Sequence, residues 1–468
     1  MDQPQGSAFA RPLAPAVVSE LREVLGGRLQ LSEAIRQQHG SCEAHFETMP
    51  PDAVAFPHST EETARLVQIC ARHAIPVIPY GAGSSLEGQV VATTGGLCID
   101  LSEMNRIVAV HAADLDCTVQ AGVTREQLNE YLRDQGLFFP IDPGANATIG
   151  GMAATRASGT NAVRYGTMRD AVLSLTAVMP DGRIVRTARR ARKSSAGYDL
   201  TRLLIGSEGT LGIITEVTLR LHGIPDAISS AVCAFDTLQG AVDTVITAIQ
   251  LGVPVARIEL VDEVGIGAIN SYAKLDLEEK PTLFFEFHGT KASVDEQVEI
   301  VREIAIDLGG GEFVWSNLSE ERSRLWKARH QAYYAGLSLR PGSTGWATDV
   351  CVPISRLADC ILETRADLDT TQIPTPIVGH VGDGNFHVLF VLDPASEEEA
   401  AEAARLNDRL VARALAMDGT CTGEHGIGLG KQQWLIEEHG PGVDIMRLIK
   451  RALDPGNLFN PGKIFAMP

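Results

Sequence analysis

The chain has 468 residues, 44% of them hydrophobic and 21% charged, and its formal net charge at pH 7 is −19. A chain of this length can bury a large core and should form two domains, or three by length alone. The charge argues against nucleic acid as a partner, and no apolar run reaches the roughly 18 residues that a membrane-spanning helix needs. We therefore expect a globular enzyme without a transmembrane segment.

The N-terminal segment and the cysteines bear on where the protein resides. Residues 1–18 carry one positive side chain, Arg11, and no apolar core, so we expect a loose leader and no signal peptide, followed by a helix near Val17–Leu25. The eight cysteines are scattered and form no C-x-x-C motif, which argues against disulfides and iron–sulfur ligation. A reducing, cytoplasmic location follows.

Helix and strand signals alternate through the first half of the chain. Ser59–Glu62 predicts a capped helix start, and Thr124–Gln127 predicts a second helix that should stop at Gly136. A strand is expected over Ile75–Tyr80. The segment Ile213–Leu221 alternates in the way that a strand does.

After a boundary at 222–225, strand and helix signals repeat in four units. The expected strands are 231–235, 256–261, 282–287, 312–315, 348–353, 377–380 and 386–392, and the expected helices are 238–251, 294–308, 355–368 and 396–417. Strands separated by helices of this length imply an α+β or α/β layer, with helices covering one face of the sheet. The tail from 431 should be helical and then rich in Pro-Gly turns.

Six basic residues crowd into one stretch of this acidic chain. They are Arg183, Arg186, Arg189, Arg190, Arg192 and Lys193. A solvated loop between two elements is the simpler explanation. The alternative is a contact for an acidic redox partner or a membrane surface, which would place the protein at the inner face of that membrane.

The segment Val378–Val388 is typical of a hairpin, and it carries two histidines. Asp383-Gly384 lies between apolar runs and favours a two-residue type I′ turn, because both turn residues need positive φ. In that register 382 pairs with 385, 381 with 386 and 380 with 387, so His380 and His387 would be directly opposed, with Cβ atoms roughly 4.5–5.5 Å apart. Such imidazoles can share a metal ion, but half-buried sheet histidines with hydrogen-bonded nitrogens explain the spacing equally well.

A second motif, Gly423-Glu424-His425-Gly426, lies downstream. It offers a carboxylate next to a third imidazole. Two histidines, one glutamate and an open position make up the ligand set of a catalytic metal site. In isolation, a surface glutamate and a loop histidine remain the alternative.

Four segments between residues 80 and 214 are rich in glycine and other small residues. They are Tyr80–Leu86, Pro143–Gly151, Ser158–Gly166 and Gly206–Ile214. In the first, Leu86 stands where G-x-G-x-x-G needs its last glycine, and residues 84–98 barely hold a crossover helix, so we expect no nicotinamide-type unit. A nest of backbone N–H groups able to hold a pyrophosphate remains. Four such segments together indicate one long cofactor.

The order of these motifs, from Tyr80–Leu86 to the closing Asn460-Pro461-Gly462-Lys463, resembles the FAD-linked oxidoreductases of the vanillyl-alcohol-oxidase type. The histidine pair and Gly423–Gly428 are similar to the branch of cytochrome-type D-lactate dehydrogenases, D-2-hydroxyglutarate dehydrogenases and glycolate oxidase flavoprotein subunits. The resemblance implies an α+β fold with three parts. These are an FAD-binding domain of two α/β subdomains (1–222), a cap domain with an antiparallel sheet covered by helices (223–420), and a C-terminal segment returning to the FAD-binding domain (421–468).

The same resemblance assigns residues to the cofactor, with residues 81–85 at the pyrophosphate and Asn460 near the flavin ring. The expected FAD contacts are Tyr80, Gly81, Ala82, Gly83, Ser84, Ser85, Pro143, Gly144, Thr148, Gly150, Gly151, Ser158, Gly159, Glu208, Gly209, Gly212, Ile214 and Asn460. Members that bind flavin covalently often carry a histidine beside the pyrophosphate loop. None lies between His73 and His111, so non-covalent FAD is implied.

The resemblance also implies a divalent metal, zinc or manganese, and a catalytic base. The metal ligands would be His380, His387 and Glu424, and the base would be His425. Arg329 matches the arginine that binds the substrate carboxylate, whereas His330 should point elsewhere on a helix. Ala347 stands where relatives that take a dicarboxylate carry a lysine, which favours a monocarboxylate such as lactate.

These motifs together imply a dehydrogenase that oxidises a D-2-hydroxy acid, with D-lactate as the first choice. Electrons would pass to a cytochrome, a quinone or an electron-transfer flavoprotein. A glycolate oxidase flavoprotein subunit and a D-2-hydroxyglutarate dehydrogenase are the near alternatives. A non-redox enzyme similar to alkyl-dihydroxyacetonephosphate synthase is the distant one.

Overall fold

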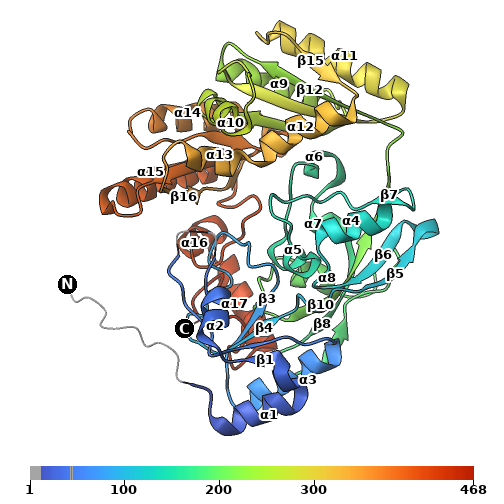
Figure 1. Cartoon of the computed structure of the whole chain (residues 1–468), viewed down its shortest axis with the longest axis vertical. Coiled ribbons are helices and arrows are strands. Elements are labelled where there is room, and N and C mark those ends of the chain that lie inside the picture. Colours follow the sequence, from blue (N-terminus) through green and yellow to red (C-terminus); the bar gives the residue numbers. More distant parts are fainter. Residues whose placement is uncertain (1–11, 43, 45, 468) are drawn as a thin grey trace.

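The computed structural model describes residues 12–42, 44 and 46–467, which form two lobes (Figure 1). The lower lobe holds the N-terminal half and the last two helices, and the upper lobe holds most of the chain between them. The helix expected near Val17–Leu25 is confirmed as α1 (Pro15–Leu25), whereas residues 1–11 of the expected leader lie outside the described residues. Among the helices described, none combines the length and apolar character that crossing a membrane requires.

The lower lobe begins with a four-stranded sheet in the order β1-β2-β4-β3, in which β4 runs parallel to both β2 and β3. Its elements are β1 (Leu29–Gln30), α2 (Glu33–His39), β2 (Ala53–Ala55), α3 (Thr60–Arg72), β3 (Val77–Tyr80) and β4 (Leu97–Asp100). Ser59 caps α3 by accepting the Glu62 N–H, as its sequence predicts. No helix lies between β3 and β4 in residues 81–96, so the rejection of a nicotinamide-type crossover is confirmed.

A five-stranded antiparallel sheet in the order β5-β6-β10-β8-β9 forms the rest of the lower lobe. Its strands are β5 (Ile107–His111), β6 (Asp116–Gln120), β8 (Val172–Val178), β9 (Ile184–Arg186) and β10 (Ile213–Arg220). The helices beside it are α4 (Arg125–Arg133), α5 (Ile149–Thr155), α6 (Ala162–Tyr165), α7 (Met168–Ala171) and α8 (Leu200–Leu204), and β7 (Leu137–Phe138) pairs with β11 (His222–Gly223). Thr124 caps α4 as expected, and Gly136 follows the helix at positive φ.

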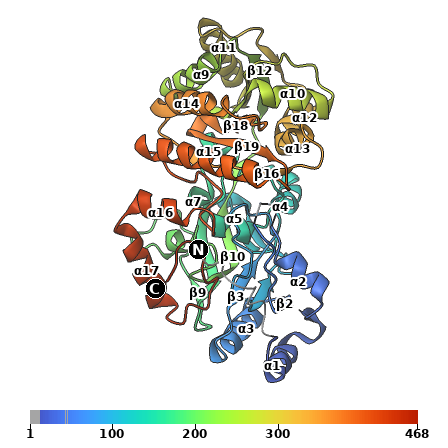
Figure 2. The same cartoon turned by 90° about the vertical axis from the view of Figure 1, so that its left-hand side faces the viewer.

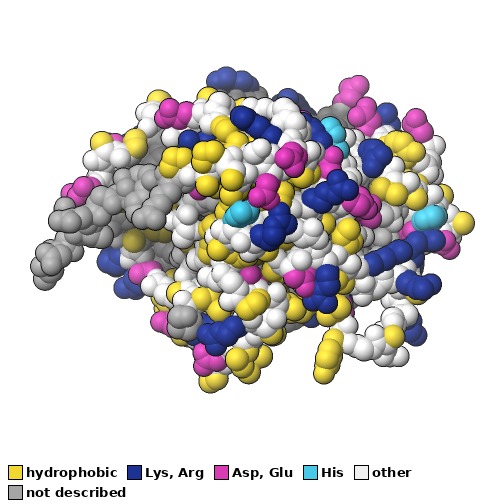
Figure 3. All heavy atoms as spheres, turned by 90° about the horizontal axis from the view of Figure 1, so that it is seen from below, with side chains coloured by type: hydrophobic (Ala, Val, Ile, Leu, Met, Phe, Trp, Pro, Cys, Tyr) yellow, Lys and Arg dark blue, Asp and Glu magenta, His cyan; other side chains and the backbone are white. Residues whose placement is uncertain are grey.

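The basic stretch 183–193 lies on the edge strand β9 and in the exposed segment after it. Arg190 binds Asp114 and Asp116 at 2.6 and 3.0 Å, and Arg183 binds Asp181. Basic and acidic side chains are interspersed on the face shown in Figure 3. Local ion pairs therefore account for part of the basic stretch.

The upper lobe is built on an eight-stranded antiparallel sheet in the order β15-β12-β14-β13-β18-β19-β16, with β17 also beside β19. The strands are β12 (Ala227–Ala234), β13 (Val255–Val261), β14 (Thr282–Gly289), β15 (Val314–Ser316), β16 (Thr344–Ala347), β17 (Val350–Cys351), β18 (Ile377–Gly379) and β19 (Asn385–Leu392). The helices are α9 (Leu238–Gln250), α10 (Glu263–Ala273), α11 (Lys291–Asp307), α12 (Ser319–His330), α13 (Ala332–Ser338), α14 (Leu357–Leu368) and α15 (Glu397–Ala416). The expected antiparallel sheet covered by helices is confirmed.

Helices cover both faces of this sheet, so the expectation of one covered face is wrong. Phe285 belongs to a hydrophobic cluster with residues of α9, α11, α14 and α15, and its neighbour Phe284 belongs to another with residues of α10, α12 and α13. Figure 2 shows these two helical layers on either side of the strands. Consecutive buried apolar residues mark a strand that is buried on both faces, because successive side chains point in opposite directions.

The C-terminal residues return to the lower lobe. Helices α16 (Gln432–His439) and α17 (Gly442–Leu453) lie beside its sheets (Figure 1), and Phe459 forms a parallel bridge with Val77 of β3. Asn460 donates from its side-chain amide to the carbonyl oxygens of Gln89 and Glu208. The chain thus closes against the segments that follow β3 and precede β10.

Gly384, between β18 and β19, has φ of 83°, and a Cβ atom there would lie 2.0 Å from the carbonyl oxygen of Val352. We predict that Gly384→Ala lowers the free energy of unfolding by about 3 kcal/mol or more, because a left-handed backbone costs roughly 1–2 kcal/mol and the clash adds to it. Gly342→Ala is the matched control, since Gly342 has φ of 87° and no atom within 4 Å of its Cβ position. Equal losses for the two variants in urea denaturation would contradict this account.

Candidate active site

The two histidines of the expected hairpin do meet, but through a different turn. Strands β18 and β19 pair so that Val378 lies opposite His387. The chain leaves the ladder after Gly379, and residues 381–383 form a 3₁₀ turn that Gly384 closes at positive φ. The two-residue Asp383-Gly384 turn, the pairings 382–385, 381–386 and 380–387, and the direct opposition of His380 and His387 are therefore wrong.

The observed register differs from the expected one by two residues, which is why the histidines still share a face. Strand side chains alternate, so a shift of two preserves the face of every side chain, whereas a shift of one would reverse it. The rings of His380 and His387 have centroids 5.5 Å apart. Bonds from Asp383 N–H to His380 O and from Gly384 N–H to Val381 O replace the expected ladder bonds.

Both imidazoles are fixed through Nδ1. His380 Nδ1 lies 2.8 and 3.0 Å from the carboxylate oxygens of Glu259, and His387 Nδ1 lies 2.9 Å from the carbonyl oxygen of Thr348. An acceptor at Nδ1 favours a proton there, so that Nε2 is the ring nitrogen that can bind a metal. Both Nε2 atoms face Glu424 Oε1, at 3.1 Å from His380 and 3.4 Å from His387.

Glu424 completes a group that fits a divalent cation. The ligand atoms of His380, His387 and Glu424 lie within 4.8 Å of one another, and Glu424 Oε2 is buried with no hydrogen-bond partner among the described residues. A buried, unpartnered carboxylate oxygen is costly unless a cation satisfies it. Two imidazole nitrogens and a carboxylate suit zinc and manganese alike.

The pKa values of Glu424 and His380 are both shifted in the direction that favours positive charge in this group. Burial alone would raise the pKa of Glu424, but His380 and His387 bring it far below its ordinary value. Burial disfavours the imidazolium of His380, yet the carboxylates of Glu259 and Glu424 raise its pKa well above the ordinary value. The pocket between these side chains thus favours a cation.

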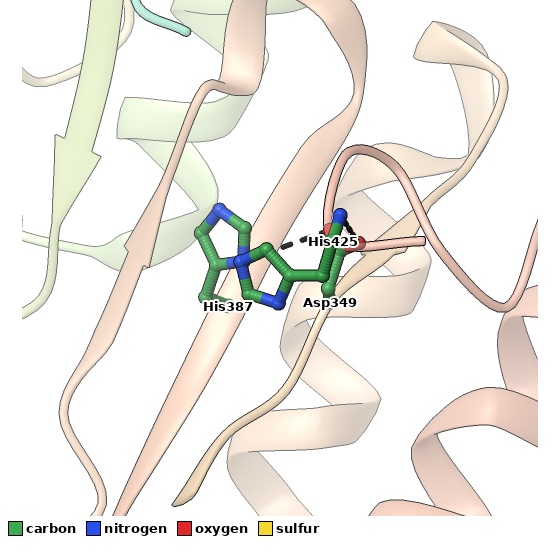
Figure 4. A group of neighbouring side chains, drawn as sticks. All are labelled: Asp349, His387 and His425. Carbon is green, nitrogen blue, oxygen red and sulfur yellow. Dashed lines mark hydrogen bonds and ion pairs between the residues drawn. The ribbon is translucent and has the colours of Figure 1, made fainter. Parts of the chain in front are cut away.

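Asp349 also lies beside two imidazoles, His387 and His425 (Figure 4), and these three side chains meet the spacing of a metal group. Asp349 Oδ2, however, already accepts the backbone N–H groups of Glu424 and His425 at 2.9 Å each and the Thr422 hydroxyl at 2.7 Å. The carboxylate therefore holds the 422–425 loop in place and is a poor candidate for a metal ligand.

His425 is placed to accept a proton. Its ring stacks on that of His387, with centroids 5.0 Å apart and planes 10° from parallel (Figure 4), and its Nδ1 is buried without a hydrogen-bond partner among the described residues. Burial lowers the pKa of His425 to about 4. The imidazole is therefore uncharged near neutral pH and available as a base.

Arg329, on the last turn of α12, is 7% exposed and binds Glu259 Oε2 through Nη2 at 2.5 Å. Its Nε is buried without a hydrogen-bond partner among the described residues. His330 lines the same cavity, so the expectation that it points elsewhere is wrong. Helix α12 ends at His330, and both of its last residues border the cavity.

A single cavity joins these side chains to the small-residue segments. Its lining includes Tyr80, Gly81, Ala82, Gly83, Ser84, Ser85, Pro143, Gly144, Thr148, Gly150, Gly151, Ser158, Glu208, Gly209, Gly212, Ile214, Arg329, His380, His387, Glu424, His425 and Asn460. Of the expected cofactor contacts, Gly159 alone is not in this lining. A Cβ at Gly159, whose φ is 144°, would lie 2.5 Å from the carbonyl oxygen of Asp142.

The cavity wall fits a long polar cofactor such as FAD. Ser85 Oγ and Asn460 Oδ1 are buried side-chain atoms of the lining that have no hydrogen-bond partner among the described residues. Such atoms need a partner, which a bound cofactor can supply. The backbone of residues 81–85 faces the same space without large side chains, as pyrophosphate binding requires.

The sequence interpretation missed Glu259 and Asp349, the buried carboxylates that orient the site. Each lies in or directly before an apolar strand, and both are almost inaccessible to solvent, at 0% and 1% exposure. An acid within an apolar strand is the available signal, since a buried carboxylate needs partners. The sequence does not identify those partners, because Arg329 lies 70 positions from Glu259, and Asn385 and Glu424 lie 36 and 75 positions from Asp349.

Comparisons with known proteins agree with this architecture. Residues 224–464 match the family model described as FAD linked oxidases, C-terminal domain, and residues 51–188 match the FAD binding domain. The probable D-lactate dehydrogenase, mitochondrial, of Danio rerio is 54% identical over 96% of this chain and 92% of its own length. The D-lactate dehydrogenase (cytochrome), mitochondrial, of Arabidopsis thaliana is 48% identical over 96% of this chain and 80% of its own length.

A solved structure shows the same fold at low identity. The 4-ethylphenol oxidase from Gulosibacter chungangensis, in its isoeugenol complex, matches 97% of both chains with a TM-score of 0.78 at 18% identity. The expected α+β fold of the vanillyl-alcohol-oxidase type is thereby confirmed. The chain belongs to the FAD-linked oxidases, a family of FAD-dependent oxidoreductases.

Proposed function

We propose that the protein is an FAD- and divalent-metal-dependent dehydrogenase that oxidises a D-2-hydroxy acid, with D-lactate as the favoured substrate, to the 2-keto acid. The observation that carries this proposal is the convergence of two imidazole Nε2 atoms on Glu424 beside an uncharged His425. The names of the two relatives, at 54% and 48% identity, support D-lactate.

The proposed chemistry divides between the bound groups and the chain. Bound FAD would accept a hydride, and a cation held by His380, His387 and Glu424 would act as a Lewis acid toward the hydroxyl group. An unactivated hydroxyl is a weak acid, so a positioned base is needed. His425 takes that proton, and Arg329 orients the substrate carboxylate. FAD would be held non-covalently by the small-residue segments.

The charges of the cavity wall support a monocarboxylate. Among the described residues of the lining, Arg329 is the only one with a lysine or arginine side chain. Ala347, Pro376, Val378 and Leu389 contribute apolar surface to the same wall. A second acid group, as in a dicarboxylate, would therefore lose its hydration without gaining a cation.

For the electron acceptor and the cellular location, we keep the predictions made from the sequence. We propose that a cytochrome, a quinone or an electron-transfer flavoprotein accepts the electrons, and the name of the Arabidopsis relative supports the first. A cytoplasmic location, at or near the inner face of a membrane, stays a prediction. Both relatives above carry the word mitochondrial in their names.

Anaerobic D-lactate should bleach the flavin absorbance of the purified holoenzyme, whereas L-lactate and D-2-hydroxyglutarate should leave most of it oxidised. Persistent oxidised flavin with D-lactate would instead favour a non-redox enzyme similar to alkyl-dihydroxyacetonephosphate synthase. Steady-state turnover with an artificial dye acceptor separates a self-sufficient dehydrogenase from a glycolate oxidase subunit that needs partners.

His387→Ala should remove the bound metal and the activity but leave the flavin in place, because His387 Nε2 points at Glu424 in the metal group. Metal content by mass spectrometry and the flavin spectrum measure the two effects separately. His439→Ala is the control, since His439 is exposed and lies on α16 outside the cavity. Loss of flavin together with metal would mean that this region has a structural role.

His425→Gln should lower kcat by about 10²- to 10⁴-fold, the usual contribution of a positioned general base. Metal and flavin contents should match those of the unmodified enzyme, because neither set of expected ligands changes. Stopped-flow measurement of flavin reduction isolates the chemical step. A reduction rate close to that of the unmodified enzyme would show that another group removes the proton.

A further inference from the structure

Glu259 is a buried acid that no step of the proposed reaction uses. It lies within β13, has 0% exposure and is not among the described residues that line the cavity. Its two carboxylate oxygens lie 2.8 and 3.0 Å from His380 Nδ1, and Oε2 also lies 2.5 Å from Arg329 Nη2. A carboxylate is not buried at this depth without compensation, so these two partners account for its presence.

We propose that Glu259 is a positioning residue that couples metal binding to substrate binding, because its one carboxylate orients both the metal ligand His380 and the substrate-binding Arg329. This inference rests on the proposed function and adds to it a residue that touches neither the metal nor the substrate.

The contact between Glu259 and His380 determines which ring nitrogen of His380 can bind the metal. An acceptor at Nδ1 keeps a proton on that nitrogen, so that Nε2, which faces Glu424, is the ring nitrogen that would bind the metal. The same contact restrains rotation of the ring. A histidine that loses such a partner typically loses 10- to 100-fold in metal affinity.

The contact with Arg329 sets the direction of the guanidinium. Glu259 accepts a hydrogen bond from Arg329 Nη2, while Arg329 Nε is buried and has no hydrogen-bond partner among the described residues. One side of the guanidinium fork is therefore fixed by protein, and the remaining N–H groups can bind a carboxylate. Glu259 also supplies negative charge between two cations, Arg329 and the proposed metal, which would otherwise repel each other in a dry interior.

Two substitutions separate the two contacts. Glu259→Gln keeps an oxygen that can accept the His380 Nδ1–H, but it places an uncharged amide against Arg329. Glu259→Leu removes both contacts at similar volume. If Glu259 works through both partners, Glu259→Gln should disturb mainly the substrate side, and Glu259→Leu should disturb both sides.

The neighbouring strand offers a matched control. Glu286 on β14 is 6% exposed and has the same kinds of partner, His288 Nε2 at 2.8 Å and Arg257 Nε at 3.5 Å. Glu286 is not among the described residues of the cavity lining. Glu286→Gln therefore reproduces the loss of a buried acid–histidine–arginine contact at a place where no metal ligand depends on it.

The experiment measures the Mn²⁺ dissociation constant of each flavin-loaded variant by electron paramagnetic resonance, together with KM and kcat for D-lactate. We expect Glu259→Leu to weaken Mn²⁺ binding by 10- to 100-fold, and Glu259→Gln to raise KM by at least about 10-fold with a smaller change in Mn²⁺ affinity. Glu286→Gln should leave the Mn²⁺ affinity unchanged.

Mn²⁺ affinity in Glu259→Leu equal to that of the unmodified enzyme, or an equal loss in Glu286→Gln, would overturn the proposal. So would an unchanged KM in Glu259→Gln, which remains informative if Glu259→Leu does not fold. An unmodified enzyme that binds Mn²⁺ but leaves D-lactate unoxidised would refute the proposed function alone. The Mn²⁺ affinities would still decide whether Glu259 orients His380.

Discussion

The bonds from Asp349 to the backbone of Glu424 and His425 are the interaction on which the rest of the site depends. The proposed metal group draws on His380 directly after β18, on His387 of β19 and on a loop more than thirty positions later in the chain. Among the described residues, no strand pairing joins that loop to the sheet at Glu424. Burial alone would raise the pKa of Asp349, but His425, which is protonated only at low pH, and the ammonium group of Lys431 hold it well below its ordinary value. An ionised carboxylate of this kind binds backbone N–H groups strongly, which fixes both the proposed ligand Glu424 and the proposed base His425.

The same loop is held from the other lobe by a second buried acid. Glu208, in a segment that borders the cofactor cavity, accepts the N–H groups of Ile427 and Gly428 at 2.7 and 2.8 Å. Asp349 in the upper lobe therefore binds the backbone of residues 424 and 425, and Glu208 in the lower lobe binds that of residues 427 and 428. In the proposed reaction, this arrangement would keep the separation between flavin and metal constant, since the connecting loop is bonded to both lobes.

Local signals made much of the fold predictable. The starts of α3 and α4 were predictable because Ser59 and Thr124 bond to backbone three positions away, within the same turn. The helices α10 and α13 were missed, and α12 was expected only as a helix at His330, without bounds. Helix α12 shows no apolar stripe, because most of its side chains are partly or fully exposed and only Trp326, Ala328 and Arg329 are buried. The predicted turn after Gly379 was wrong because the observed turn depends on a distant hydrogen bond, from Val352 N–H to Gly384 O. No local sequence pattern contains this bond.

The return of the chain to its first lobe has a consequence for biosynthesis. The cavity wall combines residues near position 80 with Asn460, whose amide is bonded to the carbonyl oxygens of Gln89 and Glu208. Domains generally fold from the N-terminus as a chain emerges from the ribosome. Here the early sheets can form while the wall stays incomplete until residue 460 has been translated, so the cofactor cavity is completed only after both lobes have been synthesised.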